Sequence, residues 1–211
     1  MVANIPCNPR VGPPLSYTKR ELGLVRELIE KGGEVNIARL PDHLNHCHLV
    51  GTFWVDGMVI AVGAIKVPRR SYVENIASSS GVAEVISCRW ELGYLSTLEH
   101  ERGKGLGTAL VKELVRRVPE RTFATVRVGN GASEDLLSKF EFVQQGEEWP
   151  SSEHPEGKVR VWLRGFGVGR RYPSANHSAS GSVASPEPRQ DPIAGPPSSG
   201  SLPGFVSSPC P

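Results

Sequence analysis

The sequence is poor in the residues that mark a protein held together by disulfides or metal ions. Its 211 residues include four cysteines, Cys7, Cys47, Cys88 and Cys210, and no two of them form a C-x-x-C pair. Scattered cysteines without such pairs are typical of proteins in a reducing compartment. A chain of this length can bury a hydrophobic core without either kind of cross-link.

Long apolar runs and a large charge of one sign are also absent. No run approaches the roughly 18 apolar residues that a membrane helix requires, and MVANIPCNPRVGPP at the start contains no apolar targeting segment. Lys and Arg total 24 against 22 Asp and Glu, so the formal net charge is +2. The basic residues are scattered, which argues against nucleic acid or a membrane as partner. We therefore expect a soluble, cytoplasmic protein.

The composition divides the chain into three segments. Residues 167–211 are rich in Ser, Pro and Gly and include few residues that could form a core, so we expect a disordered tail. Residues 1–14 are expected to be a flexible N-terminal segment. Residues 15–166 are expected to form a single folded domain without internal repeats.

The first element of this domain is predicted to be a helix that starts with a capping box. Thr18 and Glu21 have the T-x-x-E spacing of such a box, and Gly32-Gly33 ends the pattern. The apolar residues between them recur at helical spacing: Leu22, Val25, Leu28 and Ile29.

The elements that follow predict a mixed sheet with helices packed against it. Residues 48–55 and 58–67 are apolar runs on either side of Asp56-Gly57, a pair that favours a hairpin turn. A polar stretch follows, over residues 68–81. Thereafter we expect a strand in residues 85–98, a helix from Leu106, a strand in 121–128, a short helix in 133–140 and a strand in 158–164.

Residues 101–110, ERGKGLGTAL, place three glycines, Gly103, Gly105 and Gly107, where a helix begins. Glycine destabilises a regular element by about 0.5–1 kcal/mol relative to alanine, so the cluster indicates a role other than stability. The first N–H groups of a helix have no internal partners and attract anions. The side of this helix that we expect to be buried has Leu106, Ala109, Leu110 and Leu114.

Two nucleotide-binding motifs are excluded by spacing. A phosphate loop of the form G-x-x-x-x-G-K-[ST] fails because Leu106 follows Gly105. The dinucleotide pattern G-x-G-x-x-G fails because Thr108 stands where the third glycine belongs. The pattern that fits is R-x-x-G-x-G, made by Arg102, Gly105 and Gly107.

With this motif the sequence resembles the GNAT superfamily of acetyl-coenzyme-A-dependent N-acetyltransferases. Residues 91–114 resemble that family's central strand, pyrophosphate loop and following helix, and residues 122–142 resemble its next strand and helix. The resemblance implies an α/β (α+β) fold with a mixed, mostly antiparallel central sheet flanked by helices. Two central parallel strands would splay apart to admit acetyl coenzyme A.

The resemblance also implies which residues bind the cofactor. Backbone N–H groups from Arg102 to Thr108 would surround the pyrophosphate, and the strand end at residues 95–97 would pair with the pantetheine arm and polarise the thioester carbonyl. Asn130 matches a position that often contacts this arm, although it could equally be a turn residue before Gly131. The full implied set is Leu95, Ser96, Thr97, Arg102, Gly103, Lys104, Gly105, Leu106, Gly107, Thr108 and Asn130.

Glu91 is the candidate general base, because it lies eleven residues before Arg102, as the base does in the histone-acetylating branch of the family. A base is needed because an amine with a pKa near 10.4 must lose a proton before it attacks. The tyrosine that many members use as general acid is replaced by Leu137. Tyr94, water or the cofactor thiolate itself are the alternatives. Cys88 could in principle be acetylated, but no histidine is placed beside it.

The segment 140–142 departs from the family's Leu-Gly-Phe step, because Glu141 stands where the glycine favours a left-handed backbone. The HLNHCH segment at residues 43–48 looks like a metal site but lacks a second ligand pair, so we expect no metal. Arg69-Arg70, in the loop before the central strand, could contact the cofactor phosphates or the substrate.

The sequence therefore predicts an N-acetyltransferase that moves an acetyl group to a primary amine by direct attack in a ternary complex. The acceptor would be a small-molecule or peptide amine, and a homodimer is possible. Two alternatives stay open. One is a non-catalytic acyl-coenzyme-A binding module, and the other is an acyltransferase that uses another acyl donor or a hydroxyl acceptor.

Overall fold

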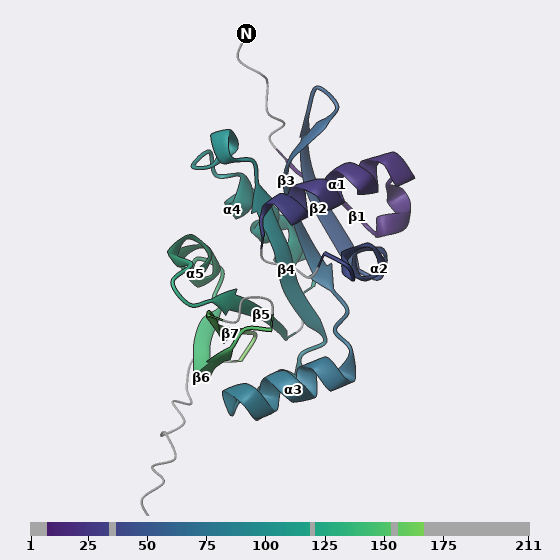
Figure 1. Ribbon diagram of the computed structural model, residues 1–211. Helices are drawn as coiled ribbons and strands as arrows, with labels where there is room; N and C mark the ends of the chain where they lie inside the picture. The colour runs from purple at the N-terminus through teal and green to yellow at the C-terminus, as the bar shows by residue number, and fades with distance from the viewer. Residues whose placement is uncertain (1–7, 34–36, 119–120, 153–155, 167–211) are drawn as a thin grey trace, which may run out of the picture. The chain divides into compact units, whose positions relative to one another are not determined.

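The computed structural model describes residues 8–33, 37–118, 121–152 and 156–166 (Figure 1). The chain divides into two units, Met1–Arg170 and Arg171–Pro211. The first unit contains all of the described residues. The tail expected at residues 167–211 lies outside them.

The described residues form one seven-stranded sheet in the order β1-β2-β3-β4-β5-β7-β6. Every neighbouring pair is antiparallel except β4 and β5, which are parallel. This mixed, mostly antiparallel sheet confirms the predicted fold class. The strands are β1 (Arg10–Gly12), β2 (Leu49–Val55), β3 (Met58–Lys66), β4 (Trp90–Thr97), β5 (Thr122–Arg127), β6 (Val143–Pro150) and β7 (Lys158–Arg164).

Helices flank this sheet, and none among the described residues is long and apolar enough to cross a bilayer. The α-helices are α1 (Lys19–Lys31), α2 (Leu40–Asn45), α3 (Arg70–Ser80), α4 (Leu106–Arg116) and α5 (Gly131–Ser138). Three short 3₁₀ helices are η1 (Pro14–Ser16), η2 (Ala83–Ser87) and η3 (Glu99–Glu101).

The predicted capping box and hairpin turn are both present. The Thr18 hydroxyl accepts a hydrogen bond from the Glu21 N–H at 3.2 Å, and the Glu21 carboxylate accepts one from the Thr18 N–H at 2.7 Å. These bonds satisfy two of the orphan donors at the start of α1. Between β2 and β3, Asp56 and Gly57 have φ angles of 47° and 76°, which is the pair of left-handed conformations that a two-residue hairpin favours.

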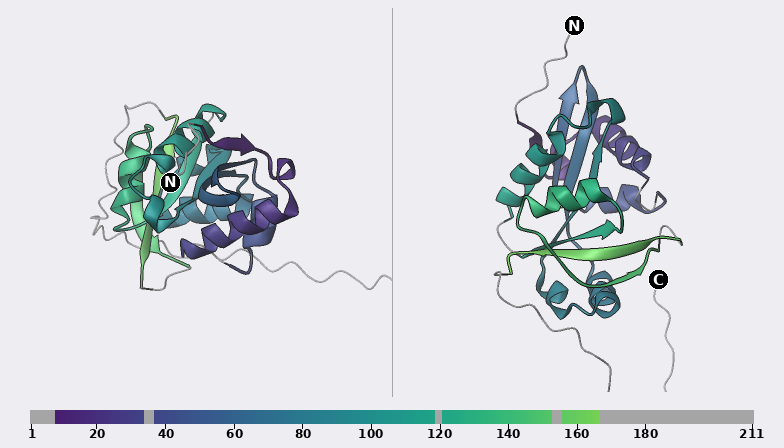
Figure 2. Two further views of the ribbon diagram at one scale, coloured as in Figure 1. Left: turned by 90° about the horizontal axis from the view of Figure 1, so that it is seen from above. Right: turned by 90° about the vertical axis from the view of Figure 1, so that its left-hand side faces the viewer.

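Helices α1 and α4 cover opposite faces of the central strands (Figure 2). On one face, Val25 and Leu28 of α1 pack with Val62 of β3. On the other face, Leu110 of α4 packs with Ala61. The alternation of neighbouring β3 residues between the two clusters follows from the two-residue period of a strand. Leu106, Leu110 and Leu114 are buried as predicted, whereas Ala109 is only partly buried.

Several elements differ from the sequence-based expectation. The polar stretch 68–81 forms α3, and the expected strand 85–98 begins only at Trp90 because residues 83–87 form η2. The short helix runs from 131 to 138 instead of 133–140. The sheet also reaches back before residue 15, since β1 pairs with β2. Strand β6 and helix α2 were not expected at all.

Candidate active site

The two parallel strands at the centre of the sheet pair for only two residues and then separate. Trp90 faces Thr122 and Glu91 faces Phe123, and no later residues of β4 and β5 are paired. Beyond Glu91, the edge of β4 that faces β5 therefore has no strand partner among the described residues. A cavity of about 1140 Å³ lies at this divergence, lined by both strands and by α3. The predicted splaying of two central parallel strands is thus present.

Strand β4 contains a bulge within the cavity wall. Its register with β3 shifts between Val62 and Ala64, so that Gly63 lies opposite an extra residue. Tyr94 has a φ of 55° there, which is unusual for a residue with a bulky side chain. A bulge leaves part of the backbone unpaired and redirects it, and such irregularities are frequent beside active sites. Leu95, immediately after the bulge, lines the cavity.

Glu91 lies at the last position of β4 that pairs with β5, at the point where these two strands begin to diverge. It is 2% exposed, and three side chains contact the same carboxylate oxygen, Oε1. Lys66 Nζ of β3 lies 2.6 Å from this oxygen, the Tyr72 hydroxyl of α3 donates to it at 3.2 Å, and the Thr125 hydroxyl of β5 donates at 3.4 Å. Glu91 therefore joins three elements and also lines the cavity.

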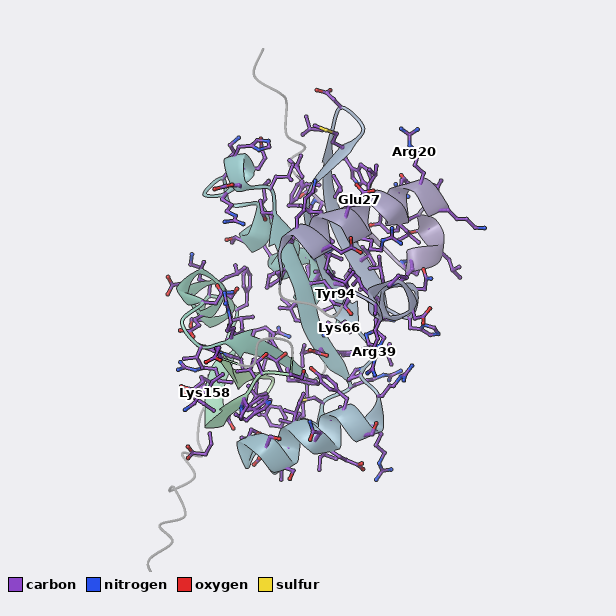
Figure 3. The ribbon with its side chains drawn as sticks, viewed as in Figure 1. Arg20, Glu27, Arg39, Lys66, Tyr94 and Lys158 are labelled. Carbon is purple, nitrogen blue, oxygen red and sulfur yellow. The ribbon has the colours of Figure 1, made fainter. Side chains whose placement is uncertain are left out.

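Two tyrosines line the same cavity with hydroxyls that stay protonated. Burial, followed by the negative charge of Glu91, raises the pKa of Tyr72 well above its ordinary value. Burial also raises the pKa of Tyr94, and Lys66 Nζ lies 4.9 Å from the centre of the Tyr94 ring. Figure 3 shows Tyr94 and Lys66 close together, with Arg39 further toward α3. Both phenols are thus neutral, and Tyr72 already uses its one proton in the hydrogen bond to Glu91.

The glycine cluster forms an irregular turn between η3 and α4. Gly103 and Gly105 have φ angles of 76° and 79°, which L side chains rarely adopt, and a Cβ at either position would meet nothing within 4 Å. Within the described part of the chain, the backbone N–H groups of residues 103–108 have no hydrogen-bond acceptor. The first backbone N–H of α4 that donates a hydrogen bond is that of Ala109, whose acceptor is Gly105 O at 3.0 Å.

This turn has the properties of an anion site. Its free amides lie at the N-terminus of an eleven-residue helix, where the helix dipole favours negative charge. Lys104 Nζ contacts Glu101 at 2.9 Å, and Arg102 Nε donates to Thr97 O at 3.4 Å. A Cβ atom at Gly107 would lie 3.4 Å from the side chain of Leu136 in α5. These residues fit a diphosphate held mainly by backbone amides.

The predicted site residues do not all lie in one place. Glu91, Leu95, Ser96 and Asn130 line the cavity, whereas Thr97 and residues 102–108 lie outside its lining. The Ser96 hydroxyl donates to Leu28 O of α1 at 2.9 Å. Asn130 is also the N-cap of α5, since its side-chain oxygen accepts a hydrogen bond from the Ser133 N–H at 3.2 Å.

The alternative residues considered for proton transfer or acyl transfer differ in their access to the cavity. Leu137, which replaces the family's tyrosine, is 1% exposed and lines the cavity with an apolar surface. Cys88 is 6% exposed and is absent from the lining. Burial raises the pKa of the Cys88 thiol to about 12, so the thiol is uncharged near neutral pH. An uncharged thiol is a poor nucleophile.

The HLNHCH segment has local structural contacts. His46 Nδ1 lies 2.6 Å from Asp42 O, Cys47 Sγ donates to His43 O at 3.4 Å, and the His48 ring stacks on Trp90 at 4.3 Å. Among the described residues, no three His, Cys, Asp or Glu side chains are gathered as a metal site.

Sequence reasoning missed the residues that hold Glu91. Lys66 lies near the end of the apolar run 58–67, and Tyr72 lies in the polar stretch 68–81, to which no helix or strand was assigned. The buried residues of α3, Val73, Ile76, Ala77 and Ser80, follow helical spacing. That spacing was the available signal for a helix here, although four of the stretch's residues are serines and weaken it.

Comparisons with known proteins agree with this geometry. Residues 82–149 match the family model described as FR47-like protein, a range that runs from η2 to β6 and includes the glycine turn. No curated protein matches the sequence. Many solved structures share the fold.

Three of these structures illustrate the likeness. An acyl-CoA N-acyltransferase from Pseudomonas aeruginosa has a TM-score of 0.53 at 13% identity, and the match covers 76% of this chain and 99% of that one. A GNAT family acetyltransferase from Streptococcus agalactiae has a TM-score of 0.54 at 14% identity, with 76% and 98% covered. The protein yncA from Salmonella typhimurium, described as an acetyltransferase with its cofactor acetyl-CoA, has a TM-score of 0.53 at 15% identity, with 80% and 99% covered.

The family match and the shared fold include the same central part of the molecule. The FR47-like match covers the central strand, the glycine turn and the following strand and helix, and the solved structures share the mixed sheet around them. Residues 82–149 thus match the FR47-like family model, and the described domain has the fold of the solved GNAT acetyltransferases.

Proposed function

We propose that this protein is an N-acetyltransferase that moves the acetyl group of acetyl coenzyme A to a primary amine. The single observation that carries the proposal is the row of unpartnered amides at residues 103–108, placed at the end of the splayed strand β4. Amides in this position are suited to a diphosphate, and the free β4 edge is suited to an extended arm that leads from it.

Acetyl coenzyme A would supply the activated acetyl group as a thioester. The cofactor-binding set would be the implied one: Arg102 to Thr108 for the pyrophosphate, residues 95–97 for the arm, and Asn130 at its side. The amine lone pair would form the new C–N bond while the C–S bond breaks. A backbone N–H at the β4 bulge would stabilise the negative charge that develops on the carbonyl oxygen.

Glu91 would take the proton that the amine must lose, directly or through a water molecule on Oε2, since the three protein contacts are made to Oε1. The thiolate that leaves must gain a proton. Tyr94 lines the cavity with a protonated hydroxyl and could supply it, as could water. Direct attack in a ternary complex is favoured over a covalent intermediate because Cys88 is buried and outside the cavity.

The test is turnover by the Glu91→Gln variant, which retains a hydrogen-bonding group of the same shape. We expect the variant to bind coenzyme A as the wild type does, measured by calorimetry, while thiol release with an amine panel falls by about 10²–10⁴-fold. A wild-type protein that binds coenzyme A but acetylates no amine would instead favour a non-catalytic acyl-coenzyme-A binding module. A protein that releases no heat with coenzyme A would refute both.

A further inference from the structure

The candidate base, Glu91, is already part of an ion pair. Lys66 Nζ lies 2.6 Å from Oε1, and the hydroxyls of Tyr72 and Thr125 donate hydrogen bonds to the same oxygen. The other oxygen, Oε2, makes no hydrogen bond or ion pair with any described residue. Lys66 therefore offsets the charge of the carboxylate, while one oxygen is left to accept a proton.

The Lys66 side chain reaches Glu91 along the wall of the cavity. A Cβ atom at Gly93 of β4 would lie 2.9 Å from Lys66 Cε and 3.2 Å from its Nζ, so the lysine lies over a position without a side chain. Lys66, Gly93 and Glu91 all line the cavity. An amine that approached Oε2 would therefore meet the ammonium group of Lys66 beside it.

The other titratable groups close to Glu91 add no charge near pH 7. Burial raises the pKa of Tyr72 and of Tyr94 above the ordinary value for a phenol. Burial also raises the pKa of the Cys47 thiol, which is under the influence of both Lys66 and Glu91, to about 12. Glu91 is moreover the single carboxylate among the described residues that line the cavity. A second cation beside Lys66 would have to share that carboxylate with it.

A histidine in the same cavity shows how a nitrogen base responds to these surroundings. His43 of α2 lines the cavity. Burial first, and then positive charges that include those of Arg69 and Lys66, lower the pKa of His43. An added proton is thus disfavoured on this base. A substrate amine beside Lys66 would be under the same influence.

From this arrangement we infer that the acceptor is a weakly basic primary amine that binds in its neutral form, of the kind that the α-amino group of a peptide presents. The inference rests on the proposed function. A strongly basic alkylamine would enter as an ammonium ion, and Lys66 would repel it. A neutral amine avoids this repulsion and donates an N–H hydrogen bond to Oε2.

The difference in basicity is large enough to decide which amines react. At pH 7.5 an α-amino group with a pKa near 8 is neutral in roughly one molecule in four. A lysine-like amine with a pKa near 10.4 is neutral in roughly one molecule in 800. A site that accepts the neutral form therefore discriminates strongly against alkylamines at this pH.

The reaction of a neutral amine leaves one proton for the base to take. The nitrogen forms the C–N bond to the carbonyl carbon, Glu91 Oε2 takes the surplus proton directly or through water, and the C–S bond breaks. Tyr94 or water protonates the leaving thiolate, and Glu91 returns its proton to solvent. An ammonium ion would have to lose a further proton before its attack, and a single carboxylate holds only one.

The inference is tested with the full-length protein and acetyl coenzyme A, using amines in matched pairs of different basicity. The pairs are phenylalaninamide with 2-phenylethylamine and glycinamide with propylamine, and the first member of each is the weaker base. We expect kcat/KM at pH 7.5 to be about tenfold higher for the weaker base.

The shape of the pH profile gives a second reading from the wild type. Between pH 7 and 9, kcat/KM for 2-phenylethylamine should rise by nearly tenfold per pH unit, because only its neutral fraction reacts. The profile for phenylalaninamide should level off at lower pH. For any other amine that is acetylated, the acidic limb should likewise lie at that amine's own pKa.

Two variants show whether Lys66 causes the discrimination. In Lys66→Met an ammonium ion can take the place of Lys66 at Glu91, so the KM for 2-phenylethylamine at pH 7.5 should fall by about tenfold and its pH profile should flatten. Lys19→Met removes the same charge from an exposed position at the start of α1, outside the cavity lining, and should leave both unchanged. Neither variant should alter the KM for acetyl coenzyme A.

The outcomes that overturn the inference differ from those that overturn the function. A wild-type profile for 2-phenylethylamine that is flat between pH 7 and 9, a preference for the stronger base in each pair, or an unchanged KM in Lys66→Met would refute the inference while the proposed function stands. If Lys66→Met does not fold, the wild-type profiles decide alone. If coenzyme A binds but no amine releases thiol, the proposed function is wrong and the inference falls with it.

Discussion

Lys66 Nζ lies 2.6 Å from Glu91 Oε1, and the antiparallel register of β3 and β4 places these two residues directly opposite one another. The Lys66 side chain is 21% exposed and that of Glu91 is 3% exposed, so one partner is nearly withdrawn from water. A carboxylate in that position depends on its partner, because removing one member of a buried pair leaves an uncompensated charge. The candidate base is therefore also part of the fold's stability.

We expect Lys66→Met to lower the free energy of unfolding by about 3 kcal/mol, because Glu91 would lose its ionic partner. Urea denaturation followed by circular dichroism measures the loss. Arg70→Met, which breaks an exposed pair with Glu74, is the control and should change stability by less than about 1 kcal/mol. Adding Glu91→Gln to Lys66→Met should restore part of the loss. Equal small losses for both single variants would show that the buried pair contributes little.

Cys88 is expected to be unreactive in the native protein. Its pKa of about 12 lies above the ordinary thiol value because of burial, so the group loses its proton only as the pH rises toward 12. At pH 8 the thiolate fraction is then roughly one in 10⁴, and alkylation by iodoacetamide should be slow until denaturant is added. Peptide mass spectrometry follows Cys88 separately from the other cysteines. Rapid native labelling, or loss of turnover in Cys88→Ser, would reopen a covalent route.

Gly105→Ala should weaken coenzyme A binding by about tenfold. Alanine is strained at a φ of 79°, so the turn would shift and misplace its free amides. Gly81 at the end of α3 has a φ of 71° and equally open surroundings, so Gly81→Ala imposes a similar strain away from the turn. Calorimetry should give an unchanged dissociation constant for Gly81→Ala, while both variants lose about 1 kcal/mol of stability. Equal affinity in the two variants would contradict a binding role for the turn.

Features encoded by a few adjacent residues could be predicted from the sequence. The capping box at Thr18 and the hairpin at Asp56-Gly57 each depend on local hydrogen bonds or on a required φ angle, and both are present. The glycine turn before α4 is another such feature. Because local chemistry decides these structures, no knowledge of the tertiary packing was needed.

Elements whose residues lack a clear apolar period could not be predicted. Strand β6 is exposed along most of its length as the last strand of the sheet, so it lacks the alternation that marks a half-buried strand. Its Gly146, with a φ of 66°, lies against Ser80 O of α3, a contact that only tertiary packing creates. Helix α3 was missed because its buried face is made partly of small and polar residues.

Contacts in the candidate site that depend on the register of β3 with β4 also could not be predicted from the sequence. Glu91 was predicted from its spacing to Arg102, but its contact with Lys66 requires the pairing of β3 with β4. That pairing includes a bulge at Tyr94, and without its extra residue the register would slip by one and Glu91 would no longer lie opposite Lys66. The cavity lining likewise combines segments that are far apart in the sequence, since Arg39 and Arg69 both contribute to it.

Glu141 adopts the left-handed backbone that the family's Leu-Gly-Phe step assigns to glycine, with a φ of 63°. The Phe142 N–H donates to Leu137 O at 3.3 Å across this residue, a bond typical of a helix that ends through a left-handed residue. Glu141→Gly should therefore raise the free energy of unfolding by about 0.5–1 kcal/mol, since glycine removes the strain of the Cβ. Glu141→Ala is the matched control, because it deletes the carboxylate but retains the Cβ, and it should not stabilise the protein. Urea denaturation distinguishes the two variants, and equal stabilisation by both would show that the carboxylate, not the backbone angle, is unfavourable here.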